Sequence, residues 1–121
     1  MDKAQVYNSF WNSFQWKAYE QTTVPDNAPA QYITYEYAEG YIGDTLALSA
    51  SLWMRSTSWA EIEQKARQIG SAVGYGGKVL NYDGGKLWIQ RGATFSQRLE
   101  EPNDRTIRRI VININVEFIS A

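Results

Sequence analysis

Apolar and polar side chains alternate along the last part of the chain, and this pattern predicts a strand with one buried face. Ile110, Ile112, Ile114, Val116 and Phe118 fall on one side, with Asn113, Asn115 and Glu117 on the other. Each of these apolar side chains contributes about 1.5–3 kcal/mol when it is buried. We therefore expect this strand to form a major part of the core, and its removal to unfold the protein.

A hairpin is predicted upstream. Residues 44–55 alternate in the same way, with Leu46, Leu48, Ala50, Leu52 and Met54 on one face. Residues 31–37, "QYITYEY", are rich in β-branched and aromatic side chains, which favour a strand. The two segments should pair in antiparallel fashion, with one face against the core.

Two helices are predicted from apolar residues at helical spacing. The first covers residues 3–19, where Val6, Phe10, Phe14 and Ala18 recur every four positions, and the prolines of residues 24–29 follow it. The second begins at a capping box, Ser58 to Glu61, and ends at Gly74. Its buried stripe is expected to be Ile62, Ala66, Ile69 and Val73.

A second hairpin is predicted from residues 79–82 and 86–91, which flank the turn Asp83-Gly84-Gly85. The polar residues 92–105 then read as a long loop or irregular strand. The order of elements predicts an α+β fold: a single antiparallel or mixed sheet of about four to five strands with two α-helices packed on it. A chain of 121 residues, 44% of them hydrophobic, is expected to form a single domain over 1–121.

The amino-acid composition limits the kinds of catalytic and metal site that the protein could contain. The sequence has no cysteine and no histidine, so thiolate nucleophiles, disulfides and the commonest general base and metal ligand are excluded. We expect no enzyme activity, no cofactor and no metal site. A formal charge of −1 disfavours a protein that grips nucleic-acid phosphates, and no signal-peptide or membrane-spanning pattern is seen, so a cytoplasmic protein is expected.

The aromatic side chains leave two interpretations open. Five tryptophans and eight tyrosines could stack sugars or single-stranded nucleic acid. However, Trp11, Trp53, Trp59 and Trp88 fall within predicted helices and strands, which favours core or subunit-contact roles. The glycines of residues 74–77 follow a helix and lack the lysine of a phosphate-binding loop, so they indicate a turn.

Charges of both signs gather around the polar stretch 92–105. The carboxylates there are expected to form a solvated cluster, because no apolar pocket is evident to shift their pKa values. The stretch either is a flexible solvated loop or contacts a neighbouring molecule. For the second case, the candidate subunit or tube interface residues are Arg91, Arg98, Glu100, Glu101, Asp104 and Arg105.

Four segments carry a resemblance to a known family: "YITYEYAEG", "DTLALSASLWMRSTSWAEIEQKARQIG", "YDGGKLWIQRG" and "RRIVININVEF". Together with the N-terminal helix, they resemble the small tail terminator, or tail completion, proteins of long-tailed bacteriophages and prophages. The most diagnostic part is the alternating strand that ends near Trp53, the serine/threonine turn and the helix that begins near Glu61. The resemblance covers most of the chain and contains no catalytic motif.

This resemblance implies a structural virion protein of the tail or neck, assembled in the host cytoplasm. Its subunits would form a hexameric ring at the head-proximal end of the tail tube, where the ring stops tube growth and offers a surface to the head. The implied partners are other copies of the chain, the major tail tube protein and a head-closure or connector protein, with DNA passing through the ring without sequence-specific binding. Two alternatives remain: another neck component, such as a connector or minor capsid protein, and a small aromatic-rich ligand-binding module.

Overall fold

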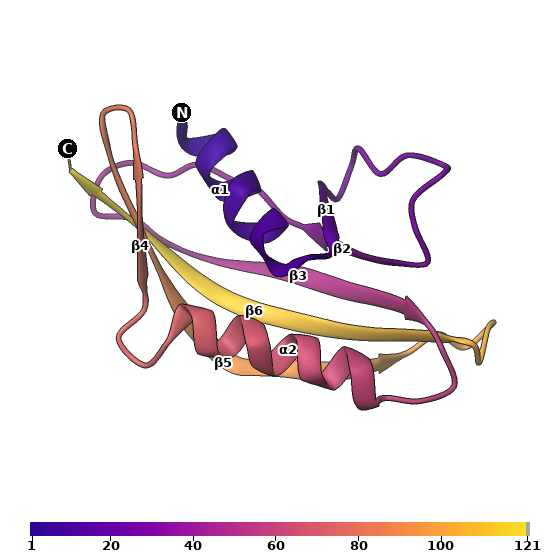
Figure 1. The fold of residues 1–121 in the computed structure, drawn as a ribbon. Helices are drawn as coiled ribbons and strands as arrows, with labels where there is room; N and C mark the ends of the chain where they lie inside the picture. The colour runs from indigo at the N-terminus through magenta and orange to yellow at the C-terminus, as the bar shows by residue number, and fades with distance from the viewer. Residues whose placement is uncertain (121) are drawn as a thin grey trace.

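The computed structural model describes residues 1–120, which form an α+β fold with two helices and one mixed, strongly curled sheet shaped like half of a barrel (Figure 1). The α+β prediction is confirmed. The predicted number of strands was too low, because the sheet has six, in the order β1-β2-β3-β6-β5-β4. The elements are α1 (Lys3–Trp11), a 3-10 turn (Asn12–Phe14), β1 (Lys17–Glu20), β2 (Gln31–Tyr35), β3 (Thr45–Arg55), α2 (Ala60–Val73), β4 (Lys78–Tyr82), β5 (Gly85–Glu100) and β6 (Ile107–Ser120).

The two segments with the clearest alternation form the centre of the sheet. Strands β3 and β6 are antiparallel along the whole of β3, with Leu48 opposite Ile114 and Leu52 opposite Ile110. Side chains that face each other across a ladder point to the same side of the sheet, so these residues create one apolar face. The five predicted apolar residues of the last strand are all buried, and the predicted β2–β3 hairpin is also present.

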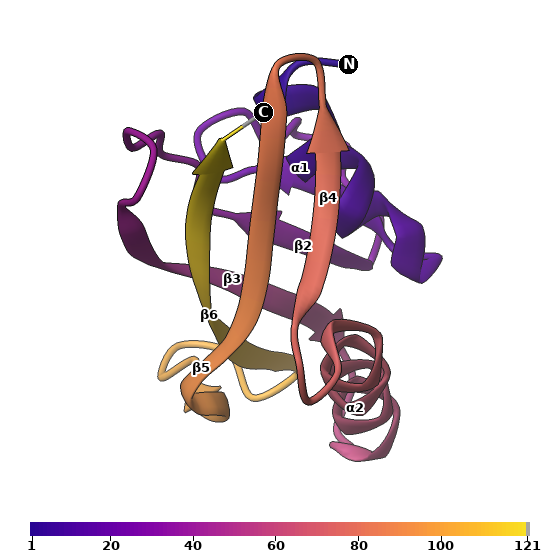
Figure 2. The same ribbon diagram turned by 90° about the vertical axis from the view of Figure 1, so that its left-hand side faces the viewer.

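Both helices lie on this apolar face, since their buried residues belong to the same cluster as those of the strands. Helix α2 contacts β3, β5 and β6 near the middle of the sheet. Helix α1 contacts β1 and β4, which are the two outermost strands, so it spans the open side of the curled sheet. Figure 2 shows this arrangement, with β4 and β5 crossing in front of α1 and of the more distant β2 and β3.

The first predicted helix was too long, because residues 17–20 form strand β1 and not its last turn. Gln15 adopts a left-handed conformation with φ 66°, which no helix interior tolerates. The side chain of Asn12 then pairs with the strand: its Oδ1 accepts from the Ala18 amide at 2.9 Å, and its Nδ2 donates to the Ala18 carbonyl at 3.2 Å. Strand β1 lies parallel to β2, with Ala18 opposite Ile33.

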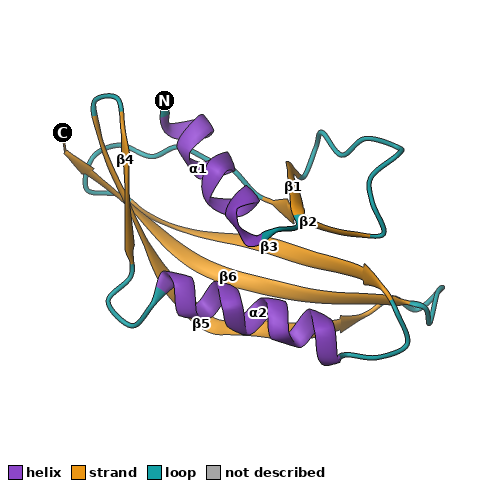
Figure 3. Ribbon diagram, in the orientation of Figure 1, coloured by secondary structure: helices purple, strands orange, loops and turns teal. Residues whose placement is uncertain are grey.

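Residues 92–105 were predicted to form a long loop or an irregular strand, and the strand alternative is confirmed as far as Glu100, where β5 ends after pairing with β6 almost throughout. The pairing is interrupted by a bulge between Arg91 and Ser96. A Cβ at Gly92 would lie 3.0 Å from the backbone of Asn113, a tight contact that a larger residue could relieve only by a shift of the strands, so glycine favours their close approach here. Figure 3 shows β3, β5 and β6 as the three long strands of the sheet.

The start of α2 differs in detail from the capping box that was predicted. The Ser58 hydroxyl accepts from the Ala60 amide, two residues on, at 3.1 Å, and the helix begins at Ala60 without a side-chain cap. The predicted apolar stripe of this helix is buried, and Gly74 ends the helix with φ 75°. The β4–β5 hairpin around Asp83 and Gly84 is confirmed.

Candidate functional site

The predicted interface residues meet, with one exception, at the end of the sheet where β5 gives way to β6. Arg98 reaches from β5 to the first turns of α2, where its Nε lies 2.6 Å from Glu63 Oε1. Its guanidinium also stacks on the Trp59 ring, with the Arg98 Cζ 4.7 Å from the ring centroid. Arg108, from the start of β6, lies over the same ring at 5.0 Å. One half-buried indole therefore lies against two guanidinium groups, which attract its π electrons.

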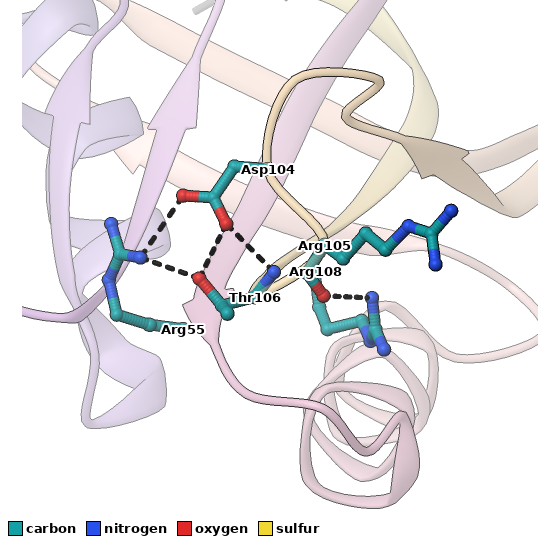
Figure 4. A network of polar contacts seen from close by, with 5 residues as sticks. All are labelled: Arg55, Asp104, Arg105, Thr106 and Arg108. Carbon is teal, nitrogen blue, oxygen red and sulfur yellow. Dashed lines mark hydrogen bonds and ion pairs between the residues drawn. The ribbon is translucent and has the colours of Figure 1, made fainter.

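A second network orders the turn between β5 and β6 (Figure 4). Asp104 Oδ1 accepts from the Thr106 hydroxyl at 2.6 Å and from the Thr106 amide at 2.8 Å, and Arg55 Nη1 lies 3.2 Å from Asp104 Oδ2. The Thr106 hydrogen bonds, followed by the nearby Arg55 guanidinium, lower the pKa of the Asp104 carboxyl below its ordinary value of 3.8. Arg108 Nη1 donates to the Arg105 carbonyl at 3.0 Å. The turn thus has a defined, hydrogen-bonded conformation.

The remaining nominated residues differ in their surroundings. Glu101 forms an ion pair with Arg109, in which Glu101 Oε1 lies 3.8 Å from Arg109 Nη1. Glu100 and Arg105 are exposed, and neither forms an ion pair within residues 1–120. The carboxylates therefore form a cluster partly paired with arginines and partly open to solvent.

Arg91 is the exception, because it lies apart from the others. It follows the apolar part of β5, and its Nε and Nη2 donate to the Gly70 carbonyl in the last turns of α2, at 3.0 and 2.7 Å. This two-point contact fastens the C-terminal part of the helix to the sheet. The Arg91 guanidinium therefore binds a helix of its own chain, away from the other predicted interface residues.

Sequence reasoning did not nominate the outer face of the sheet, which carries a second constellation. There the Trp53 ring stacks on Tyr32, with centroids 6.2 Å apart and an interplanar angle of 13°, and Arg109 covers the other side at 4.6 Å. Trp53 Nε1 donates to the Thr34 hydroxyl at 3.0 Å, and Arg109 Nε donates to the Ser51 hydroxyl at 3.1 Å. The signal in the sequence was a tryptophan on the polar side of an alternating strand.

Two adjoining hollows share Tyr32 and Trp53 in their linings. The first, of about 310 Å³, has a mostly polar floor that includes Glu36 and Ser49. The second, of about 300 Å³, lies between the ends of the strands and the loop at residues 24–30.

By contrast, Trp11 is fully buried, which confirms its predicted place in the core.

Within residues 1–120, no group of three or more acidic side chains is placed to hold a metal ion. The same part of the chain contains no helix with the length and apolar character needed to cross a membrane. The charged end and the outer face present guanidinium, carboxylate and aromatic groups that are partly or fully exposed. These groups suit contact with another molecule.

Comparison of the chain with protein-family models, with curated proteins and with solved structures found no match.

Proposed function

We propose that this protein is a structural subunit of a phage or prophage tail, forming a hexameric ring on the head-proximal end of the tail tube. The ring would end tube polymerisation and provide the surface to which the head attaches. The observation that carries the proposal is the segment 44–70, whose sequence resembles tail terminators. In the fold this segment is a strand–turn–helix unit: β3, at the centre of the sheet, leads through a short turn into α2.

The charged end of the sheet supports an assembly role. A ring repeats one heterologous contact, so each subunit needs two different complementary patches. Glu100, at the end of β5, and Arg105, in the turn that follows, present opposite charges that are not neutralised by ion pairs within residues 1–120. We assign this end to contacts with a neighbouring subunit or with the tube. The partners of the ring would be the major tail tube protein and a head-closure or connector protein.

The test is electron microscopy of purified tail tubes incubated with the protein. We expect extra density at one end of each tube and no further tube growth. Bare ends that keep growing would overturn the proposal, whatever the mass of the free protein in solution. Binding to filled heads in place of tube ends would instead identify another neck component.

Charge reversal tests the assigned end. Arg105→Glu combined with Glu100→Arg changes the pattern without breaking an ion pair within residues 1–120. Lys78→Glu is the control, because Lys78 is also exposed but lies on β4. We expect tube capping and tail joining to fall with the first variant only. Reversal at Arg98 together with Glu101 should also impair joining, and unchanged joining in both double variants would refute the assignment.

A second candidate function is supported by the outer hollow of about 310 Å³ beside Trp53 and Arg109. The hollow combines aromatic side chains with hydrogen-bonding groups such as Glu36 and Ser49, and this mixture suits the binding of a sugar or a nucleotide. Titration of tryptophan fluorescence with mono- and oligosaccharides and with nucleotides tests it. A saturable change that Trp53→Phe removes would favour a ligand-binding module, whereas a flat response would exclude these ligand classes.

A further inference from the structure

The hollow of about 310 Å³ beside Tyr32 and Trp53, here called the outer hollow, contains one charged group of each sign. Among the described residues that line it, Glu36 and Arg109 are the only charged ones. Small-molecule sites usually have volumes of about 300–1,000 Å³ and a few polar groups in fixed positions. The outer hollow therefore has the size of a site for a small ligand, and its two charges indicate what that ligand would carry.

The Glu36 carboxylate is held in place but is not neutralised. Its Oε1 accepts two hydrogen bonds from Ser49, from the amide at 2.7 Å and from the hydroxyl at 2.6 Å. No ion pair within residues 1–120 reaches this half-buried side chain. A carboxylate accepts about four hydrogen bonds, so Oε2 remains available to a donor. Because a partly buried charge without a partner is unfavourable, a cationic donor would be stabilised here.

Arg109 lies further along the same hollow and is also held in place. Its Nε donates to the hydroxyl of Ser51 at 3.1 Å, and Ser51 is buried. Its Nη1 is 3.8 Å from Glu101, which is longer than a hydrogen bond, and its Nη2 has no hydrogen bond or ion pair within residues 1–120. Arg109 therefore keeps donors for a carboxylate, which a guanidinium group can bind at two points.

The spacing of the two charges follows from β3. Ser49 and Ser51 are two residues apart on one side of this strand, so their Cα atoms are about 7 Å apart. Glu36 is bonded to the first serine and Arg109 to the second, which holds the two charges roughly 7 Å apart. In a free α-amino acid, the nitrogen and the carboxyl carbon are about 2.5 Å apart, and each charged group adds a hydrogen bond of about 2.8 Å. One such molecule bridges the gap.

We propose that the outer hollow binds a free α-amino acid, with its ammonium group on Glu36 and its carboxylate on Arg109. The amino-acid side chain would lie against Val24 and Tyr32, which also line the hollow. A neutral sugar would leave both charges without a charged partner, and Glu36 would repel the phosphate of a nucleotide. The proposal rests on the second candidate function, a ligand-binding module, and changes its ligand class. It does not rest on the tail assignment.

Calorimetric titration of the full chain with L-leucine, L-phenylalanine and L-glutamine tests the proposal. We expect at least one of them to bind saturably. The same amino acid with its nitrogen acetylated, or with its carboxyl group converted to the amide, should bind at least tenfold more weakly, because each blocked form has lost one of the two charges. The absence of saturable binding by all three, or equal binding of the blocked forms, would overturn the proposal.

Substitution of Glu36 assigns the binding to the outer hollow. Glu36→Gln keeps an oxygen that accepts from Ser49 but removes the charge, so amino-acid binding should weaken at least tenfold. The matched control is Glu117→Gln, because Glu117 is also a half-buried carboxylate but lies on β6 outside the lining of the hollow. Thermal unfolding establishes that both variants are folded. Equal binding by the two variants would contradict the proposal.

Parallel titrations with glucose and AMP separate this proposal from the proposed functions. Binding of either one without any response to the free amino acids would overturn the proposal and leave the ligand-binding module standing. A flat response to every compound would overturn both. Tube capping is scored independently by electron microscopy, so a protein that binds amino acids but leaves tube ends bare would support the proposal and refute the tail assignment.

Discussion

Substitution of Ile112 by alanine tests whether β6 stabilises the fold through one of its faces. Ile112 is fully buried at the centre of the sheet, opposite Ala50 on β3 and Ser96 on β5. Val111, its neighbour in the same strand, points to the outer face and is only half-buried. The two positions share their backbone surroundings, so the pair Ile112→Ala and Val111→Ala separates burial from the β propensity of the strand.

The expected magnitude follows from the burial of each side chain. Removing the outer carbons of a buried isoleucine loses about 0.8 kcal/mol for each methylene-sized group, and the cavity left behind adds to this loss, giving about 3 kcal/mol for Ile112→Ala. The half-exposed Val111→Ala should cost about 1 kcal/mol or less. Because domains of this size unfold at a cost of roughly 5–15 kcal/mol, the Ile112 variant should still fold.

The assay is thermal and urea unfolding of the three proteins, followed by circular dichroism and tryptophan fluorescence. We expect the melting temperature to fall by roughly 10–15 °C for Ile112→Ala and by no more than about 5 °C for Val111→Ala. Equal losses for the two variants, or a loss below about 1 kcal/mol for Ile112→Ala, would refute the assignment of the inner face.

Three further predictions concern the turns and networks. Gly77→Ala should destabilise the fold by more than about 1 kcal/mol in thermal unfolding, because Gly77 has φ 83° and a side chain there would collide with β5. The control is Gly76→Ala, which should change the stability little because a side chain at Gly76 would meet no other atoms. Asp104 has a lowered pKa, so its stabilising contribution is present above pH 3.8 and is lost as the pH falls through its folded-state pKa. Urea unfolding across this range should therefore show wild type and Asp104→Asn converging toward low pH, and a constant difference would contradict this. Arg91→Lys should lower stability by about 1–2 kcal/mol, since lysine cannot reproduce the two-point bond to the α2 carbonyl, and an unchanged urea midpoint would exclude that role.

The candidate interface could be nominated from the sequence, but its geometry could not. Arg98, Glu100, Glu101, Asp104 and Arg105 were selected as charges in a polar stretch, and the fold does bring them to one end of the sheet. Their partners, however, come from distant parts of the chain.

These contacts could not be predicted because each joins residues that lie far apart in the sequence. Arg98 meets a glutamate of α2, and Asp104 meets Arg55 at the end of β3. The outer-face stack likewise joins Tyr32, Trp53 and Arg109 from three strands. No local pattern encodes such pairs, because they depend on which strands become neighbours in the sheet.

The sequence by itself determined the elements whose side chains show a clear period. The two-residue alternation of β3 and β6 and the helical stripe of α2 arise because burial on one face selects apolar residues at fixed spacing. Three features depend on the tertiary structure: the formation of strand β1, the extension of β5 to Glu100 and the curl of the sheet. Residues 17–20 continue a helical spacing but are held as a strand by Asn12 and by pairing with β2, and the polar end of β5 is held by its ladder with β6. In both cases hydrogen bonds to a distant segment outweigh the weak local preference, and only the folded chain supplies those partners.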